Sequence, residues 1–269
     1  LYGVIKDLQK DMESGLSFHE AMAKHPTVFS ELWANLIESG EASGNLAMVL
    51  NRLAIYLERL AVFRKKIISA LIYPAILMVA GLAAFLFFTM WIMPTFAELF
   101  SGLNIKLPLL TKMLIALSAF IRKYFLLIIL LLIAGFYLFR RYINTKTGRR
   151  EYEHFLLTLP VFGEFFRAII VERFSSEMST LIESGVPILY SLEIAEHSVG
   201  NSVMSENIRK VKEEVREGRS LSEPLERSGF FEPMVVQLIT IGEEIGELSQ
   251  MFKRIDEFYQ QYVETFLTR

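Results

Sequence analysis

Cysteine is absent from the 269 residues of this sequence, so disulfide bonds, thiolate metal sites and cysteine nucleophiles are excluded. The four histidines are scattered, and no two of them stand four residues apart as zinc-binding pairs on a helix do. No glycine is followed directly by lysine, so the phosphate-binding loop of P-loop nucleotidases is missing as well. We therefore expect no catalytic residues, no metal site, no cofactor and no nucleotide hydrolysis.

Net charge is small, at −2, but it is unevenly distributed along the chain. Residues 171–269 contain 18 acidic and 10 basic side chains, so this part carries −8 and residues 1–170 carry +6. A nucleic-acid-binding protein concentrates basic residues on one surface of a folded domain, whereas here the basic residues surround apolar stretches. We expect no nucleic-acid partner.

Two stretches contain no charged residue at all. Residues 67–93 lack Asp, Glu, Lys, Arg and His, and residues 124–139 are equally uncharged, with residues 140–143 completing the second stretch. A helix of about 20 apolar residues crosses a hydrocarbon core of about 30 Å. The sequence therefore predicts transmembrane helices over residues 67–93 and 124–143. A pair of buried core helices is the alternative, which charge-free runs of this length disfavour.

Basic residues gather before the first predicted span and after the second: Arg59, Arg64, Lys65, Lys66, Arg140, Arg141, Lys146, Arg149 and Arg150. The positive-inside rule places both flanks in the cytoplasm and the connecting segment, residues 94–123, outside. Pro74 predicts a kink in the first span, and Pro94 predicts its end. Pro108 predicts the start of an amphipathic helix along the outer interface, with an apolar face of Leu109, Leu110, Met113, Leu114, Leu117 and Phe120.

An internal repeat flanks the predicted spans. The stretch after Gly15 resembles the stretch after Gly218, and ELWANLIESGEASGNLAMVLNRL aligns with EPMVVQLITIGEEIGELSQMFKRI with a one-residue gap. Both copies contain a Gly-Glu-x-x-Gly-x-Leu motif: Gly40, Glu41, Gly44 and Leu46 in the first, Gly242, Glu243, Gly246 and Leu248 in the second. No segment alternates as a β-strand does. We predict an all-α membrane protein with two transmembrane helices and two homologous cytoplasmic antiparallel helical bundles.

We expect this organisation to divide the chain into five parts: a first module, expected to be truncated at its N-terminus, over residues 1–66, a span over 67–93, a loop over 94–123, a span over 124–143 and a second module over 144–269. In the second module, a helix over residues 166–183 is predicted to end at Gly185, and Ser220 and Ser222 are predicted N-caps of a short helix. A continuous helix of about 75 Å is predicted from the first motif through the first span.

The repeated motif has a structural interpretation and a functional one. In the structural one, Gly40 and Gly242 are helix C-caps in a tight turn, and the second glycine of each motif lets two helices approach closely. In the functional one, Glu41 and Glu243 offer a carboxylate to a partner or a metal ion. We prefer the structural interpretation because helical hairpins need such glycines for their own folding. It predicts that Gly242→Val destabilises the fold and that Glu243→Gln is nearly neutral if that side chain is solvated.

The duplicated module, the two motifs, the stretch SALIYPAIL at the start of the first span, and the order module–span–loop–span–module resemble the GspF/PilC family. Members of that family are inner-membrane platforms of type II secretion and type IV pilus machines. The resemblance covers essentially the whole chain. It implies two further helices before Leu1, equivalent to residues 173–198, and a third span beyond Arg269.

The same resemblance implies a function. The chain is expected to be a multi-pass scaffold of the bacterial inner membrane that couples a cytoplasmic secretion ATPase to the assembly of pilin-like subunits. Other inner-membrane components of the machine, membrane lipids and further copies of the chain are its other expected partners. A transporter or channel component is the alternative, which uncharged spans interrupted only by Pro74 disfavour.

Overall fold

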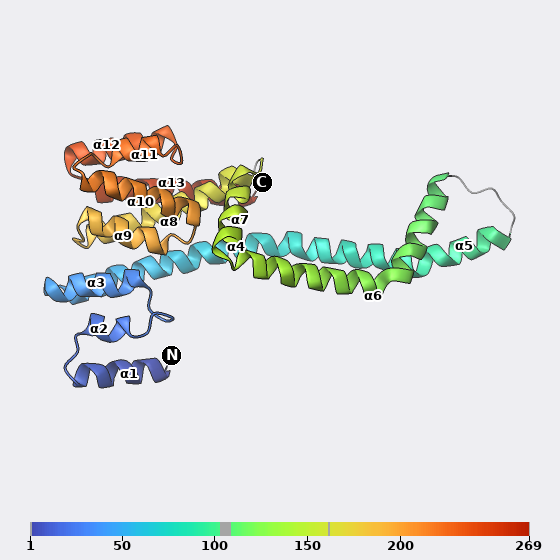
Figure 1. The fold of residues 1–269 in the computed structure, drawn as a ribbon, viewed down its shortest axis with the longest axis horizontal. Coiled ribbons are helices and arrows are strands. Elements are labelled where there is room, and N and C mark those ends of the chain that lie inside the picture. Colours follow the sequence, from blue (N-terminus) through green and yellow to red (C-terminus); the bar gives the residue numbers. More distant parts are fainter. Residues whose placement is uncertain (1, 103–108, 161, 269) are drawn as a thin grey trace. The chain divides into compact units, whose positions relative to one another are not determined.

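The computed structural model describes residues 2–102, 109–160 and 162–268, and every regular element in these ranges is helical, as predicted (Figure 1). The chain divides into two compact units. One unit comprises residues 1–67 and 150–269 and contains both copies of the repeat. The other comprises residues 68–149 and contains most of the apolar helical segments. The two units are considered separately below.

The two copies of the repeat contain the same succession of helices. The helices of the first copy are α1 (Tyr2–Glu13), α2 (Phe18–Ala23), α3 (Glu31–Ala42) and the beginning of α4 (Leu46–Phe87). Those of the second copy are α10 (Ser202–Arg216), α11 (Ser222–Arg227), α12 (Pro233–Ile245) and α13 (Leu248–Thr268). Before the second copy come α7 (Lys146–Thr158), α8 (Phe162–Glu183) and α9 (Ile188–Ser198). The sequence repeat is thus also a repeat of helices.

The second copy has a core of large apolar side chains. Phe174 of α8 and Phe252 of α13 are almost completely buried, with ring centroids 5.7 Å apart in an edge-to-face arrangement. Met204 and Ile208 of α10 and Leu225 of α11 complete the interior of this copy. Burying one such side chain stabilises a fold by roughly 1.5–3 kcal/mol, so these contacts hold the helices of this copy together.

The core of the first copy is completed by residues from outside that copy. Leu36 and Ile37 of α3 are fully buried, and they share a cluster with Leu181 of α8 and Ile194 of α9. Both of these partners are themselves fully buried. The helices α8 and α9 therefore contribute to the interiors of both copies, which makes the repeat-containing unit one packed body rather than two independent bundles.

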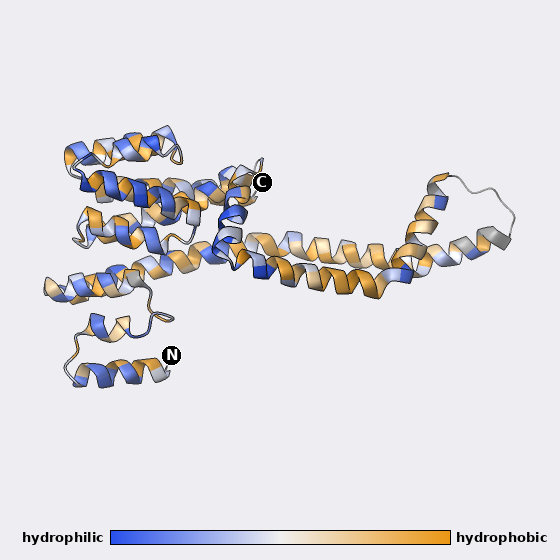
Figure 2. Ribbon diagram, viewed as in Figure 1, coloured by the Kyte–Doolittle hydropathy of each residue, from blue (hydrophilic) through white to orange (hydrophobic). Residues whose placement is uncertain are grey.

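The other unit contains the remainder of α4, the π-helix η1 (Phe88–Ile92), α5 (Met93–Gly102) and α6 (Leu109–Ile143). Two helical segments, Leu46–Phe96 and Thr111–Ile143, are each long and apolar enough to cross a membrane. Figure 2 shows the apolar colour predominating along the uncharged parts of both segments. Their most apolar windows are almost entirely exposed, as is expected of surfaces that face lipid.

Helix boundaries in this unit differ from the prediction at Pro94. The helix does not end there, because Pro94 is the second residue of α5, a position at which the missing proline N–H is not needed. The wider π-helical turn η1 comes directly before it, and the hydroxyl of Ser118 in α6 donates to the carbonyl of Thr89 in that turn. At Pro74, the position of the predicted kink, α4 continues as a single helix. Helix α6 starts after Pro108 and runs unbroken through the predicted amphipathic helix and second span.

Candidate functional site

The second glycine of each motif ends a helix. Gly44 and Gly246 have left-handed φ values of +69° and +76°, which only glycine adopts without strain. The next residue in each copy folds back, so that the N–H of Asn45 donates to the Gly40 carbonyl at 2.9 Å. In the second copy the equivalent bond is also 2.9 Å long and joins Glu247 to the Gly242 carbonyl. This is the Schellman termination of a helix.

The first glycine of each motif lies inside a helix, at the point where the next helix crosses it. A Cβ atom on Gly40 would lie 3.1 Å from Val49 Cβ, and one on Gly242 would lie 2.8 Å from Met251 Cγ. The same added atoms would lie 3.3 Å from Leu46 Cα and 3.2 Å from Leu248 Cα respectively. The roles predicted for the two glycines were therefore wrong and must be exchanged: the first allows close approach, and the second ends the helix.

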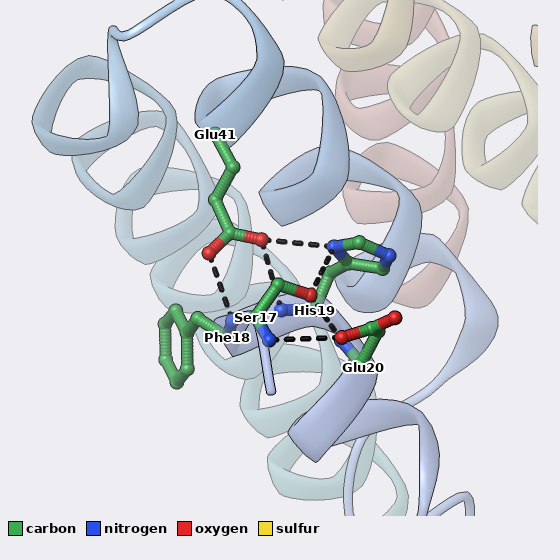
Figure 3. A network of polar contacts seen from close by, with 5 residues as sticks. All are labelled: Ser17, Phe18, His19, Glu20 and Glu41. Carbon is green, nitrogen blue, oxygen red and sulfur yellow. Dashed lines mark hydrogen bonds and ion pairs between the residues drawn. The ribbon is translucent and has the colours of Figure 1, made fainter. Parts of the chain in front are cut away.

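Glu41 binds the N-terminus of the neighbouring helix α2 (Figure 3). One carboxylate oxygen accepts the backbone N–H of Phe18 at 2.8 Å, and the other accepts that of His19 at 3.1 Å and lies 2.9 Å from His19 Nδ1. Burial alone would raise the pKa of Glu41, but the hydrogen bonds from His19 and Phe18 outweigh it and lower that pKa below its usual value. Ser17 and Glu20 complete the arrangement as a capping box.

Glu243 makes the equivalent contact in the second copy. Its two carboxylate oxygens accept the backbone N–H groups of Leu221 and Ser222 at the start of α11, the latter at 2.9 Å. The N-cap residue of α11 is Leu221, which has no side-chain cap, so the prediction that Ser220 and Ser222 are N-caps was wrong. The glutamate of the motif replaces the missing cap.

The motif therefore joins three helices within each copy through its glycines, its glutamate and its final leucine. Leu46 and Leu248 begin α4 and α13, and both pack against the apolar cluster of their own copy. Both glutamates already accept backbone hydrogen bonds from their own chain, which supports the structural interpretation of the motif. Among the described residues, no group of three histidine or acidic side chains is arranged to hold a metal ion.

A second polar site lies between the two copies, along one face of α4. Three basic residues, Arg52, Arg59 and Lys66, recur there at intervals of seven, close to two helical turns. Arg52 donates to the backbone carbonyl of Glu183 in α8, and Lys66 pairs with Glu264 in α13. We call this set of contacts the α4 seam.

The centre of the α4 seam is a buried carboxylate. The Glu177 side chain is 1% exposed and accepts hydrogen bonds from Tyr56 of α4 at 3.4 Å, Ser198 of α9 at 2.6 Å and Arg173 at 3.3 Å. Burial raises the pKa of Glu177, and the charge of Arg173 opposes that rise. Because its partners come from three helices, Glu177 ties the first copy to α8 and α9.

Besides Glu177, the α4 seam contains a buried pair of acidic residues, Glu172 and Asp256. Burial, together with the charge of Asp256, raises the pKa of Glu172 to about 8. Burial also raises the pKa of Asp256 to about 6, with the nearby charge of Arg59 opposing. Gln260 donates to both carboxylates. Sequence reasoning did not single out this pair or the rest of the seam, although the seven-residue spacing of basic residues on α4 was a readable signal.

Comparison with known proteins identifies the family. A family model described as "Type II secretion system (T2SS), protein F" matches twice, over residues 1–94 and 174–269, which is consistent with the internal repeat. A "Type IV pilus assembly protein PilC" of Thermus thermophilus is 39% identical over 262 residues, covering 97% of this chain and 64% of that protein. The "Type IV pilus assembly protein PilC" of Myxococcus xanthus is 32% identical, covering 97% of this chain and 63% of that protein.

Similarity extends to secretion proteins as well as pilus proteins. The "Type II secretion system protein F" of Pseudomonas aeruginosa is 37% identical over 240 residues, covering 89% of this chain and 59% of that protein. The chain thus spans about two thirds or less of the length of these relatives. The family matches cover more than half of the chain, and relatives above 30% identity match nearly all of it. The chain therefore belongs to the GspF/PilC family of type II secretion and type IV pilus assembly proteins.

Proposed function

We propose that this chain is an inner-membrane platform that transmits work from a cytoplasmic secretion ATPase to the assembly of pilin-like subunits. The proposal is supported by its relatives, which are named as pilus assembly and secretion proteins. The structural observation that carries it is α4, which begins at the motif of the first copy and continues into the first apolar segment. A helix shared in this way is a direct covalent path from a protein-binding module to the membrane.

The α4 seam attaches α4 to further helices of the repeat-containing unit, in addition to its covalent connection to the first copy. Contacts through Arg52 and Tyr56 hold the early part of α4 against α8, and the contact through Lys66 holds it against α13 of the second copy. A displacement imposed on either copy therefore acts on α4. No nucleotide-binding loop occurs in the sequence, so the energy in this proposal comes from another protein.

The proposed topology follows the positive-inside rule. Both modules, residues 1–66 and 144–269, lie in the cytoplasm, the spans are residues 67–93 and 124–143, and residues 94–123 lie outside. The proposed partners are the secretion ATPase, pilin-like subunits, other inner-membrane components of the machine and further copies of this chain. The motif residues serve mainly to build the modules that these partners bind.

Cysteine labelling tests the topology directly because these 269 residues contain no cysteine. Glu217→Cys introduces a thiol in the second copy, and Lys112→Cys introduces one in α6, both at exposed positions. A membrane-impermeant maleimide added to intact spheroplasts is expected to label the Lys112→Cys variant alone. Labelling of the Glu217→Cys variant in intact spheroplasts would refute the proposed orientation.

Nucleotide hydrolysis tests the scaffold role. The purified chain in detergent is expected to hydrolyse no ATP, and to bind the cognate secretion ATPase and change its rate. Hydrolysis by the chain alone that is abolished by a point substitution would overturn the scaffold proposal. Failure of the purified chain both to bind the ATPase and to change its rate would overturn the coupling role.

A further inference from the structure

The end of α6 and the start of α7 form a tightly built corner. Helix α6 ends at Ile143 and α7 begins at Lys146, with only Asn144 and Thr145 between them. The Thr145 hydroxyl donates to the Tyr142 carbonyl at 2.7 Å and accepts the N–H of Gly148 at 3.1 Å. One side chain therefore binds the last turn of α6 and caps the first turn of α7.

Gly148 makes the corner tighter than any other residue permits. A Cβ atom at this position would lie 2.2 Å from the Tyr142 carbonyl oxygen and 2.9 Å from Thr145 Oγ1. Both are far below ordinary van der Waals separations, and the atoms are backbone or anchored side chain. All of these residues belong to the unit of residues 68–149, so the geometry of the corner is set within that unit.

Basic side chains gather at this corner without acidic neighbours in sequence. Arg140 and Arg141 occupy the last turn of α6 and Lys146 begins α7, and all three are exposed. No acidic residue occurs between Glu98 and Glu151. In the described ranges of the chain, none of the ion pairs involves Arg140, Arg141 or Lys146. Their charges are thus available to an external anion.

The corner stands where the apolar surface of α6 stops. Leu138 and Phe139 are 63% and 52% exposed, and the apolar segment that begins near Thr111 ends at Ile143. Tyr142, 49% exposed, adds the kind of aromatic side chain that settles at the level of lipid headgroups. Arginine and lysine directly beyond a span extend their charged ends to the same level.

We propose that the α6–α7 corner binds the phosphate of an anionic phospholipid through Arg140, Arg141 and Lys146. A zwitterionic headgroup carries its own cation beside the phosphate and is attracted much less, so the corner is selective for headgroups with net negative charge. Each basic residue near an anionic surface strengthens such binding by about fivefold. The inference rests on the membrane insertion in the proposed function, but not on the role in pilus or pseudopilus assembly.

Native mass spectrometry of the full chain in detergent, titrated with phosphatidylglycerol or phosphatidylcholine, tests the site. The triple variant Arg140→Gln, Arg141→Gln, Lys146→Gln is expected to bind phosphatidylglycerol at least about tenfold more weakly than the unaltered chain. A matched control, Lys112→Gln, Arg122→Gln, Lys123→Gln, removes three exposed charges from the other part of α6 and is expected to bind normally. The charge-preserving variant Arg140→Lys, Arg141→Lys is expected to retain binding, and circular dichroism is expected to show equal helicity in all variants.

Each contrary result has a definite meaning. Equal retention of the two lipids by the unaltered chain, or equal loss in the test and control variants, would overturn the site. Displacement of phosphatidylglycerol by millimolar inorganic phosphate at constant ionic strength would overturn the lipid assignment, since the corner would then be a site for free anions. ATPase binding and cysteine labelling are measured independently, so failure of the lipid site is distinguishable from failure of the proposed function.

Discussion

The carboxylate of Glu243, in the last turns of α12, accepts a hydrogen bond of 2.9 Å from the backbone N–H of Ser222 in the first turn of α11. The first N–H groups of a helix have no partner within it, and they form the positive end of its dipole. A carboxylate from a neighbouring helix accepts hydrogen bonds from these N–H groups and places a negative charge at the positive end of the dipole. Glu41 makes the same contact with α2, so the repeat preserves an interaction between helices as well as a turn.

Replacing Glu243 by glutamine is expected to cost about 1–2 kcal/mol of stability, because the amide keeps one acceptor and loses both the charge and the second acceptor. This revises the expectation that the substitution is neutral, which assumed a solvated side chain. Thermal unfolding of the full chain in detergent measures the effect. Glu244→Gln is the matched control, since the neighbouring side chain is exposed. Identical melting of the two variants would contradict the capping role.

Gly242→Ala is expected to destabilise the chain by roughly 1–3 kcal/mol through overpacking, since the new methyl group would lie 2.8 Å from Met251 Cγ. The position is helical, so backbone strain is not the cause. Gly3→Ala in α1 is the control, because no atom lies within 4 Å of a Cβ placed there, and it is expected to be neutral or stabilising by up to about 1 kcal/mol. Equal melting temperatures for the two variants would refute the close approach of α12 and α13.

Tyr56→Phe is expected to weaken the attachment of α4 to α8 by about 1 kcal/mol, because it removes one hydrogen-bond donor from the buried carboxylate of Glu177. Tyr2→Phe, at a side chain that is 84% exposed, removes the same hydroxyl from a solvated position. Hydrogen exchange of residues 46–67 measures the effect and is expected to be faster in the Tyr56→Phe variant alone. Unchanged exchange would show that the α4 seam does not depend on this contact.

Stability is expected to fall as pH rises from about 5 to about 8. The pKa of Glu172 is raised to about 8 in the folded chain, from an ordinary value of 4.5, by burial and by Asp256. The folded state therefore binds more protons than the unfolded state across this interval, so unfolding becomes easier as protons are withdrawn. The stabilisation is complete below the unfolded pKa and is lost as pH passes through the folded pKa.

Glu172→Gln is the informative variant for this pH dependence. Glutamine resembles the protonated carboxyl group and does not titrate, so the melting temperature is expected to vary less with pH between about 5 and 8. Glu20→Gln is a suitable control. Hydrogen bonds from Ser17 lower the pKa of Glu20, so titration of Glu20 affects stability only at acid pH. A pH profile for Glu172→Gln that is as steep as that of the unaltered chain would exclude Glu172 as the source.

The sequence alone was sufficient for the features that depend on local composition and periodicity. Charge-free runs predict the apolar helices, because removing a peptide chain from water requires both apolar side chains and internally satisfied backbone groups. The constant offset between the motifs at Gly40 and Gly242 predicts the repeat, which the structure contains as two successions of four helices. The left-handed conformation of Gly185 was likewise predictable from the glycine and proline that end α8.

Contacts between residues far apart in the chain were decided only by the tertiary structure. A glycine that ends a helix and a glycine that lets another helix cross look alike in sequence, and only the position of Met251 beside Gly242 separates them. The sequence does not distinguish Glu243 from a surface glutamate, and only the structure shows that N–H groups of α11 lie beside it. In the same way, only the structure shows that Tyr56 and Ser198 donate hydrogen bonds to Glu177. Propensity acts on the residues of one element, whereas burial and pairing depend on which elements meet, and that depends on packing of the whole chain.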